Sequence, residues 1–130
     1  MKDSVLGRRL INQRIDGPGH RRPEDVVAWS GAVQAQEYEP AKWGVGLRMR
    51  SGAIDADVQC AFDDGRILRT HVLRPTWHFV LPEDIRWMLA LTAPRVSRAM
   101  SYYNRTLGLD ERTFRKSNTA LERALRDGAH

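Results

Sequence analysis

The stretch that decides the fold runs from residue 67 to residue 80 and reads ILRTHVLRPTWHFV. Its β-branched and aromatic residues form two β-type runs, residues 67–72 and residues 76–80, in which the side-chain period is two. Leu73, Arg74 and Pro75 separate the runs, and a proline in so short a connection favours a turn. The stretch therefore predicts an antiparallel β-hairpin.

Helical patterns lie on the N-terminal side of this hairpin. Apolar residues recur at helical spacing over about residues 4–14, 23–36 and 54–64. The second helix is expected to fade near Gln36, because Pro40 prevents it from continuing. Residues 41–50 are interpreted as a short helix or an irregular segment. Three helices followed by a two-stranded hairpin is the element order of a winged helix-turn-helix domain, so residues 1–81 are predicted to form one.

Further helices are expected after the hairpin, beginning at Pro82, Pro94 and Asp110. About fifty residues of helix are too few for a second core of their own. Residues 82–130 are therefore interpreted as a helical extension, which either packs back on the first domain or forms the start of a truncated second winged-helix domain. The predicted fold class is mainly α with a small β-hairpin (α+β).

The composition is that of one globular domain in a soluble protein. The chain has 130 residues, and 28% of them are charged. Its single cysteine, Cys60, excludes an internal disulfide framework and a cysteine-based zinc cluster, and fits a reducing compartment. No apolar run reaches the ~20 residues that span a bilayer, and the first residues lack the pattern of a secretory signal. We therefore expect a cytoplasmic protein without a membrane segment.

The positive charge is concentrated in two blocks of the sequence. Residues 1–22 and residues 95–116 each carry a net charge of +4, while the whole chain carries +5. Nearly all basic residues are arginine, whose guanidinium group donates two parallel hydrogen bonds to a phosphate. The pattern favours a polyanionic partner such as nucleic acid. The alternative is that the arginines reflect genomic base composition and solvated helix faces.

The signature R-T-H-x-x-R-x-T-x-H at residues 69–78 gives the sequence a family resemblance. Residues 10–14 (LINQR) and 33–36 (VQAQ) match the same family in the expected order. On these motifs the chain resembles the AlkZ/YcaQ-like winged-helix proteins, bacterial DNA glycosylases that excise alkylated bases and unhook interstrand crosslinks. The resemblance implies tandem winged-helix domains, of which this chain would hold the first and the opening helices of the second. It also implies alkylated or crosslinked double-stranded DNA as the partner, and a C-terminal part of the same protein that is missing here.

Gln34 and Gln36 are the candidate catalytic residues. In the glycosylase members a Gln-x-Gln motif at this place is the catalytic pair, so the resemblance implies that role for these two positions. Alkylation at N7 or N3 makes a purine cationic and a good leaving group, so hydrolysis needs a positioned water and a stabilised sugar cation, which amide groups can supply. Such side chains diverge on a helix and align on extended chain, so the pair works best if the helix ends between them. The alternative is two polar side chains that cap a helix terminus.

The hairpin carries further candidates. Arg69 and Arg74 are candidate DNA-binding residues, and Arg74 is expected to be exposed at the turn beside Pro75. His71 and His78 would lie near each other on an antiparallel hairpin, but no third and fourth ligands follow at a suitable spacing, so no metal site is predicted. For the histidines, a hydrogen-bonded polar cluster between hairpin and core is favoured over contact with DNA.

The remaining candidate DNA-binding residues lie on the C-terminal helices and are Arg95, Arg98, Arg105 and Arg115. They could follow a DNA backbone, and a charged face turned to solvent is the alternative. Residues 54–64 stand at the recognition-helix position, yet their charged residues are all acidic: Asp55, Asp57, Asp63 and Asp64. A solvated acidic face is expected and would repel phosphate, which argues against an ordinary sequence-specific regulator. The alternative is that one of these carboxylates helps to position water.

The four tryptophans are expected to be buried, with a stacking platform for an extruded base as the alternative. They are Trp29, Trp43, Trp77 and Trp87. Taken together, the sequence predicts a winged-helix DNA glycosylase, or its N-terminal portion, that needs no cofactor and no metal. The alternatives are a non-catalytic DNA-binding winged-helix protein and an inactive truncated remnant.

Overall fold

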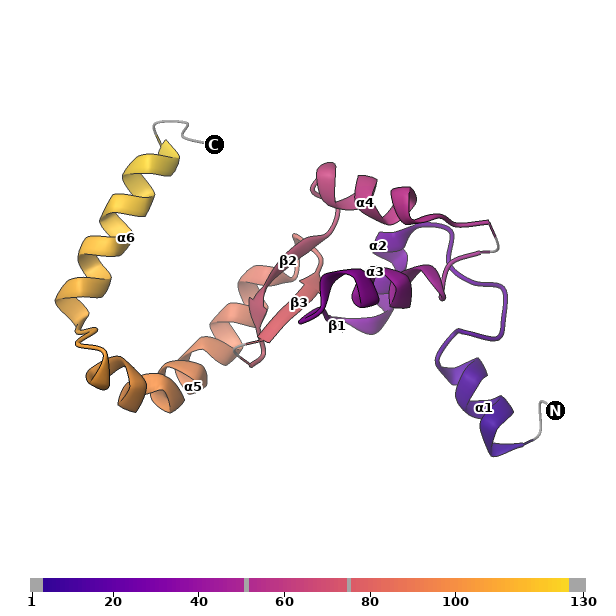
Figure 1. Ribbon diagram of the computed structural model, residues 1–130, viewed down its shortest axis with the longest axis horizontal. Helices are drawn as coiled ribbons and strands as arrows, with labels where there is room; N and C mark the ends of the chain where they lie inside the picture. Colours follow the sequence, from indigo (N-terminus) through magenta and orange to yellow (C-terminus); the bar gives the residue numbers. More distant parts are fainter. Residues whose placement is uncertain (1–3, 51, 75, 127–130) are drawn as a thin grey trace. The chain divides into compact units, whose positions relative to one another are not determined.

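The computed structural model describes residues 4–50, 52–74 and 76–126 (Figure 1). Pro75 of the predicted hairpin turn lies outside the described residues. The elements are, in chain order, α1 (Val5–Asn12), α2 (Pro23–Ser30), β1 (Val33–Gln34), α3 (Tyr38–Gly46), α4 (Asp55–Asp63), β2 (Leu68–Val72), β3 (Thr76–Val80), α5 (Ile85–Thr106) and α6 (Glu111–Arg126). The chain divides into two compact units, Met1–Ala93 and Pro94–His130, and α5 contributes to both. These units are not the predicted domains, whose boundary between residues 81 and 82 stays a prediction.

The first unit contains a three-stranded antiparallel sheet in the order β1-β3-β2. The predicted hairpin is confirmed, and its register places Thr70 opposite His78 and Val72 opposite Thr76. The short strand β1, which the sequence reasoning missed, adds to the other edge of β3. The order α2-β1-α3-α4-β2-β3, with β1 paired to β3, is a winged-helix-like arrangement. Its three helices are α2, α3 and α4, so the helix over residues 4–14 exists as α1 but is not one of the three.

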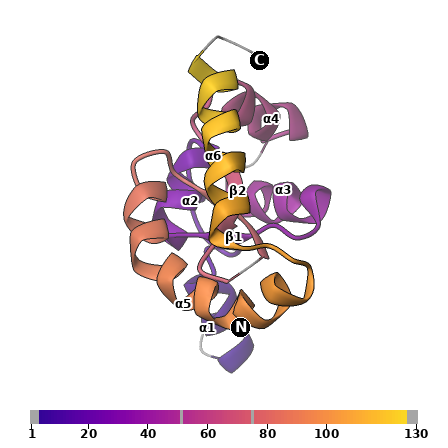
Figure 2. The same ribbon diagram turned by 90° about the vertical axis from the view of Figure 1, so that its left-hand side faces the viewer.

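The main core lies on one face of this sheet, where α2, α3 and α4 gather (Figure 1 and Figure 2). Val26, Val45, Val58 and Phe79 are fully or almost fully buried there. The opposite face of the sheet is covered in part by the beginning of α5, where Met88 packs with side chains of β2 and β3. Burial of a large apolar side chain contributes about 1.5–3 kcal/mol, so this small core is the main source of stability in the unit.

The predicted helix over residues 23–36 is wrong in its second half. The helix α2 ends at Ser30, and Gly31 follows with a φ of 72°, a left-handed conformation that glycine adopts at little cost. The chain then becomes extended, and the Ala35 N–H donates to the Trp77 carbonyl at 2.8 Å. Pairing with β3 therefore overrides the apolar spacing that made Val33 look helical.

Pro40 lies in the first turn of a helix and does not separate two helices. It is the third residue of α3, within the first turn, where a backbone N–H has no partner inside the helix. The helix predicted over residues 54–64 is confirmed as α4.

The second unit holds the rest of α5 and α6. The predicted helix start at Pro94 is wrong, because α5 continues through this residue. Good helix formers flank Pro94 on both sides and maintain the helix despite the missing N–H. The predicted cap at Asp110 is confirmed: its Oδ1 accepts from the Thr113 N–H and hydroxyl, each at 2.7 Å. None of the described residues 94–126 is buried.

The predicted fold class is confirmed, since the chain is mainly α with a small antiparallel sheet and has a winged-helix-like order of elements. Among the helices that the structure describes, none combines the length and the apolar character needed to cross a membrane.

Candidate functional site

Gln34 and Gln36 lie where the chain leaves the sheet. Gln34 is in β1 opposite His78, and both glutamines are exposed while Ala35 between them is buried. Gln34 belongs to the strand β1, whereas Gln36 lies in a bend of the chain between β1 and α3. The helix α2 ends at Ser30, before both glutamines rather than between them, and the alignment of the two side chains as a catalytic pair stays a prediction.

The side chain of Gln36 is anchored to the neighbouring strand. Its Oε1 accepts a hydrogen bond from the Trp77 N–H at 3.4 Å. One residue earlier, the main chain still pairs with β3 through Ala35 and the Trp77 carbonyl. The Gln36 amide thus continues the edge pairing after the main chain has left the sheet, which limits the freedom of this side chain.

Arg69 reaches the same segment from β2. Its Nε donates to the Ala35 carbonyl at 3.1 Å, and its Nη2 donates to the Gln36 carbonyl at 3.2 Å. The guanidinium carbon lies 4.5 Å from the centroid of the Trp77 ring and 5.4 Å from that of Tyr38. Arg69 is therefore engaged inside the protein, in contacts that the sequence did not reveal. Its contact with DNA stays a prediction.

A buried lysine, Lys42, also lies close to the Tyr38 ring. The Lys42 ammonium lies 5.0 Å from the Tyr38 ring centroid and donates to Asp55 at 3.0 Å. It also pairs with Glu39 at 3.1 Å, while the Tyr38 hydroxyl donates to Gln59 at 3.1 Å. The hydrogen bond to Asp55, above all, raises the pKa of Lys42. A charged, fully engaged ammonium of this kind is a structural group and not a nucleophile.

The two histidines of the hairpin point to opposite faces of the sheet. His71 is opposite Trp77 in the register, whereas His78 is opposite Thr70, one step along the strand. The ring of His71 is exposed and lies 3.9 Å from the Trp77 ring, centroid to centroid. His78 is buried, and its Nδ1 lies 2.9 Å from the Thr76 carbonyl oxygen. The expected histidine cluster is therefore wrong.

The four aspartates of α4 and its C-terminal cap are exposed, as the predicted acidic face requires, and they also make contacts within the protein. Each has a hydrogen-bond partner within the protein, in the pairs Asp55 with Lys42, Asp57 with the Ile54 N–H, Asp63 with Gln59 and Asp64 with Arg66. Asp57 and Asp63 make contacts within α4 and its N-terminal cap, and Asp64 pairs with Arg66 two residues later. Asp55 pairs with Lys42 of α3 and so ties α4 to another helix.

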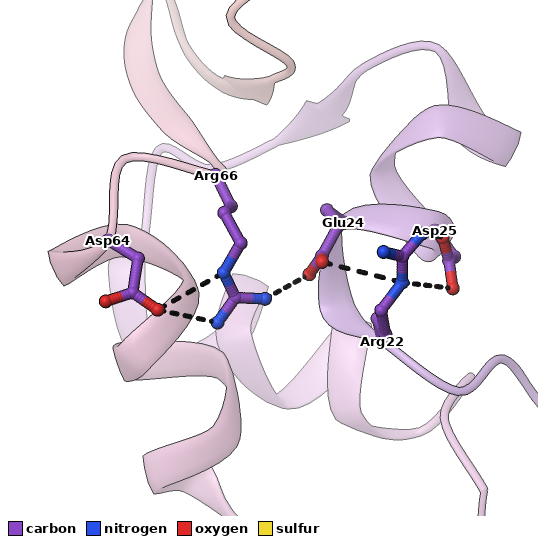
Figure 3. Close-up of polar contacts among 5 residues, drawn as sticks. All are labelled: Arg22, Glu24, Asp25, Asp64 and Arg66. Atoms are coloured by element: carbon purple, nitrogen blue, oxygen red, sulfur yellow. Dashed lines mark hydrogen bonds and ion pairs between the residues drawn. The ribbon is translucent and has the colours of Figure 1, made fainter.

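An ion-pair cluster ties the start of α2 to the end of α4 (Figure 3). Arg66 contacts Glu24 at 2.6 Å and Asp64 at 3.0 Å, and Arg22 contacts Asp25 at 2.7 Å. The hydrogen bond from Arg22 lowers the pKa of Asp25, and the hydrogen bond to Glu24 is the largest cause of the raised pKa of Arg66. This cluster holds the two helices together and lies on elements other than those of the glutamine segment.

The other predicted DNA-binding arginines are exposed. Arg74 lies at the hairpin turn of the first unit, whereas Arg95, Arg98, Arg105 and Arg115 belong to the second unit. By helical geometry, the three arginines of α5 lie within an arc of about 80° and so share one face. Arg115 pairs with Glu111 at 3.2 Å. Exposure suits a phosphate contact, and the DNA-binding role of these residues stays a prediction.

Three of the four tryptophans are not buried. Trp29, Trp43 and Trp87 expose 41%, 69% and 52% of their surface, so the expectation of an interior position is wrong for them. Trp77 is partly buried between Arg69 and His71. Within the described residues, no group of three or more potential histidine, cysteine or carboxylate ligands is placed to hold a metal ion.

Comparison with known proteins adds one finding to this geometry. A family model described as DNA glycosylase AlkZ-like matches residues 27–130. The matched region contains the glutamine pair, the hairpin and the C-terminal helices, and it excludes the LINQR segment at residues 10–14. No curated protein and no solved structure shows significant similarity to the chain.

Proposed function

The chain belongs to the AlkZ-like DNA glycosylase family, and from this premise we propose that it acts in the removal of alkylated bases from double-stranded DNA. The substrate is a cationic alkylpurine, either a single lesion or one end of an interstrand crosslink. The observation that carries the proposal is the glutamine segment: two exposed amide side chains two residues apart beside β3, one of them anchored to that strand.

The reaction is hydrolysis of the N-glycosidic bond. The bond between the base nitrogen and C1′ breaks, and its electron pair leaves with the base, which becomes neutral. A water oxygen adds to C1′ of the sugar and releases a proton to solvent. Since the leaving base already carries the positive charge, no general acid is required, and the protein has to orient water and stabilise an oxocarbenium-like sugar.

The two glutamines differ in the freedom of their side chains, and we assign their roles on this basis. Gln34 is the residue that orients the water, through a side-chain amide exposed to solvent. Gln36, whose Oε1 accepts a hydrogen bond from the Trp77 N–H, presents the second lone pair of this oxygen to the developing sugar cation from a fixed position. Preorganised dipoles of this kind cost no reorganisation when the charge develops.

DNA binding is assigned to the exposed arginines. Arg74 would contact the backbone from the hairpin, and Arg95, Arg98, Arg105 and Arg115 from the second unit. Other domains of the same protein would complete the DNA cleft. The expected site of action is the compartment that holds the DNA, the bacterial cytoplasm.

The test is base release from duplex DNA that carries N7-methylguanine. Wild-type protein should release methylguanine above the enzyme-free background, and Gln34→Ala/Gln36→Ala should abolish that release while still binding DNA. Asn118→Ala, which removes an exposed amide on α6, is the control and should behave like wild type. Salt-dependent DNA binding with no base release by the wild type would instead favour a non-catalytic DNA-binding protein.

A further inference from the structure

We infer that Arg69 is a positioning residue for the glutamine pair, and that it acts by fixing the main chain between β1 and α3. The importance of this for catalysis rests on the proposed function, whereas the fixation itself is a property of the protein without DNA. The sequence pattern had indicated a DNA-binding role for Arg69. A phosphate contact and a positioning residue predict different effects when Arg69 is replaced.

The main chain at this point needs a partner that secondary structure does not supply. The strand β1 is only two residues long, and its pairing with β3 ends with the hydrogen bond from the Ala35 N–H to the Trp77 carbonyl. The helix α3 starts at Tyr38. The carbonyl groups of Ala35 and Gln36 therefore lie between two elements, and Arg69 donates one hydrogen bond to each of them.

The guanidinium group is itself held in place by aromatic rings. It lies over the Trp77 ring at 4.5 Å and near the Tyr38 ring at 5.4 Å, distances at which a cation is attracted to the ring face. The Tyr38 hydroxyl is fixed in turn by Gln59. Trp77 also donates its N–H to the Gln36 side chain, so a single residue contacts both the positioning group and the catalytic amide.

This arrangement requires arginine rather than any cation. Two nitrogen donors of one planar group reach two successive carbonyls while the plane stacks on a ring. Lysine carries a compact charge and cannot do both. Replacement of Arg69 should therefore loosen the glutamine segment, and a misplacement of about 1 Å in a catalytic group can slow a reaction about 100-fold.

The experiment compares Arg69→Lys with Arg66→Lys. Arg66 is a matched control, because it is also a partly buried arginine with two partners, Glu24 and Asp64, that are not in the glutamine segment. Hydrogen exchange of the Ala35 and Trp77 amides is measured without DNA. Single-turnover base release at saturating protein and the Kd for the same DNA are measured in parallel. Arg69→Met, which keeps an apolar stem, replaces Arg69→Lys if the latter does not unfold cooperatively.

We expect Arg69→Lys to speed exchange of both amides about tenfold and to slow base release about 10–100-fold, with the Kd changed less than about threefold. Arg66→Lys should leave the exchange of both amides, the rate of base release and the Kd unchanged. Unchanged amide exchange in Arg69→Lys would overturn the inference, as would a weakened Kd with the saturated rate intact, which would make Arg69 a phosphate contact. If wild-type protein releases no base, the proposed function fails, and the exchange measurement by itself decides whether Arg69 fixes the segment.

Discussion

The two units of the chain contain helices of similar pattern, yet they differ in what those helices bury. In the first unit, α2, α3 and α4 pack on a sheet and enclose side chains that are almost completely buried. In the second unit, Phe114, Leu121 and Leu125 follow one face of α6 at helical spacing and expose 43%, 59% and 73% of their surface. The first unit therefore has a core of its own, and the apolar face of α6 has none among the described residues.

This difference separates the two parts of the proposed function. The glutamine pair lies in the first unit, on main chain fixed by β3 and Arg69, where catalytic geometry can be precise. Four of the predicted DNA-binding arginines lie in the second unit on exposed helical faces. Such residues can supply affinity through charge without a fixed position. The comparison predicts that substitutions in the first unit change the rate of base release, and that substitutions in the second unit change the affinity for DNA.

The largest expected effect is the loss of stability when a phenylalanine of each unit is truncated, and similar losses in both units would contradict the comparison. Phe79→Ala removes a fully buried ring that packs on Phe62 and Tyr38, and should destabilise the protein by about 3–5 kcal/mol. Phe114→Ala, the same substitution in α6, should change the free energy of unfolding by less than about 0.5 kcal/mol. Urea unfolding of the two variants measures both values. Equal losses would show that the apolar face of α6 is buried after all.

A second, smaller effect concerns charge. Lys42→Met removes the buried ammonium from Asp55 and Glu39, and should cost about 1–2 kcal/mol, because both carboxylates are largely exposed and can be hydrated. Since the pKa of Lys42 is raised above 10.5, its contribution is complete below pH 10.5 and disappears as the pH rises through the raised value. Thermal unfolding across this range should therefore show wild type and variant converging at alkaline pH. Arg115→Met, which breaks an exposed pair in α6, should show no such difference.

The smallest effect is local to α6. Asp110→Ala removes the cap at the start of the helix, and should speed hydrogen exchange of the Thr113 amide without changing exchange in the first unit. Asp110→Asn keeps a capping oxygen and serves as the control. Hydrogen bonds from Thr113 lower the pKa of Asp110, so the cap is complete above its ordinary value of 3.8 and is lost as the pH falls through the lowered value. Faster exchange across the whole chain would contradict a local role.

Much of the fold could be predicted from local patterns. The two β-runs around residue 74, the helix over 54–64 and the cap at Asp110 each depend on residues close in sequence, and each is confirmed. The error over residues 31–36 occurs where distant contacts decide. The strand β1 forms because β3 offers an edge more than forty residues later in the chain, and no pattern around Val33 reveals that partner.

The candidate site shows the same division. The glutamine pair could be found from the motif, but its backbone conformation could not, because the helix expected to reach Gln36 ends at Ser30. The role of Arg69 could not be found, because its acceptors are main-chain carbonyls that any residue could supply. The pairing of Asp55 was missed for a similar reason, since Lys42 approaches it from α3.

The most direct test separates rate from affinity in one set of measurements on DNA that carries N7-methylguanine. Single-turnover base release and the salt dependence of binding are measured for Gln34→Ala/Gln36→Ala and for Arg95→Gln/Arg98→Gln/Arg105→Gln. The first variant should lose about 100-fold or more in saturated rate and keep its Kd within about threefold. The second should keep the saturated rate and bind more weakly, with the slope of log K against log salt reduced by about 2.7. Base release by the glutamine variant at the wild-type rate would contradict the account.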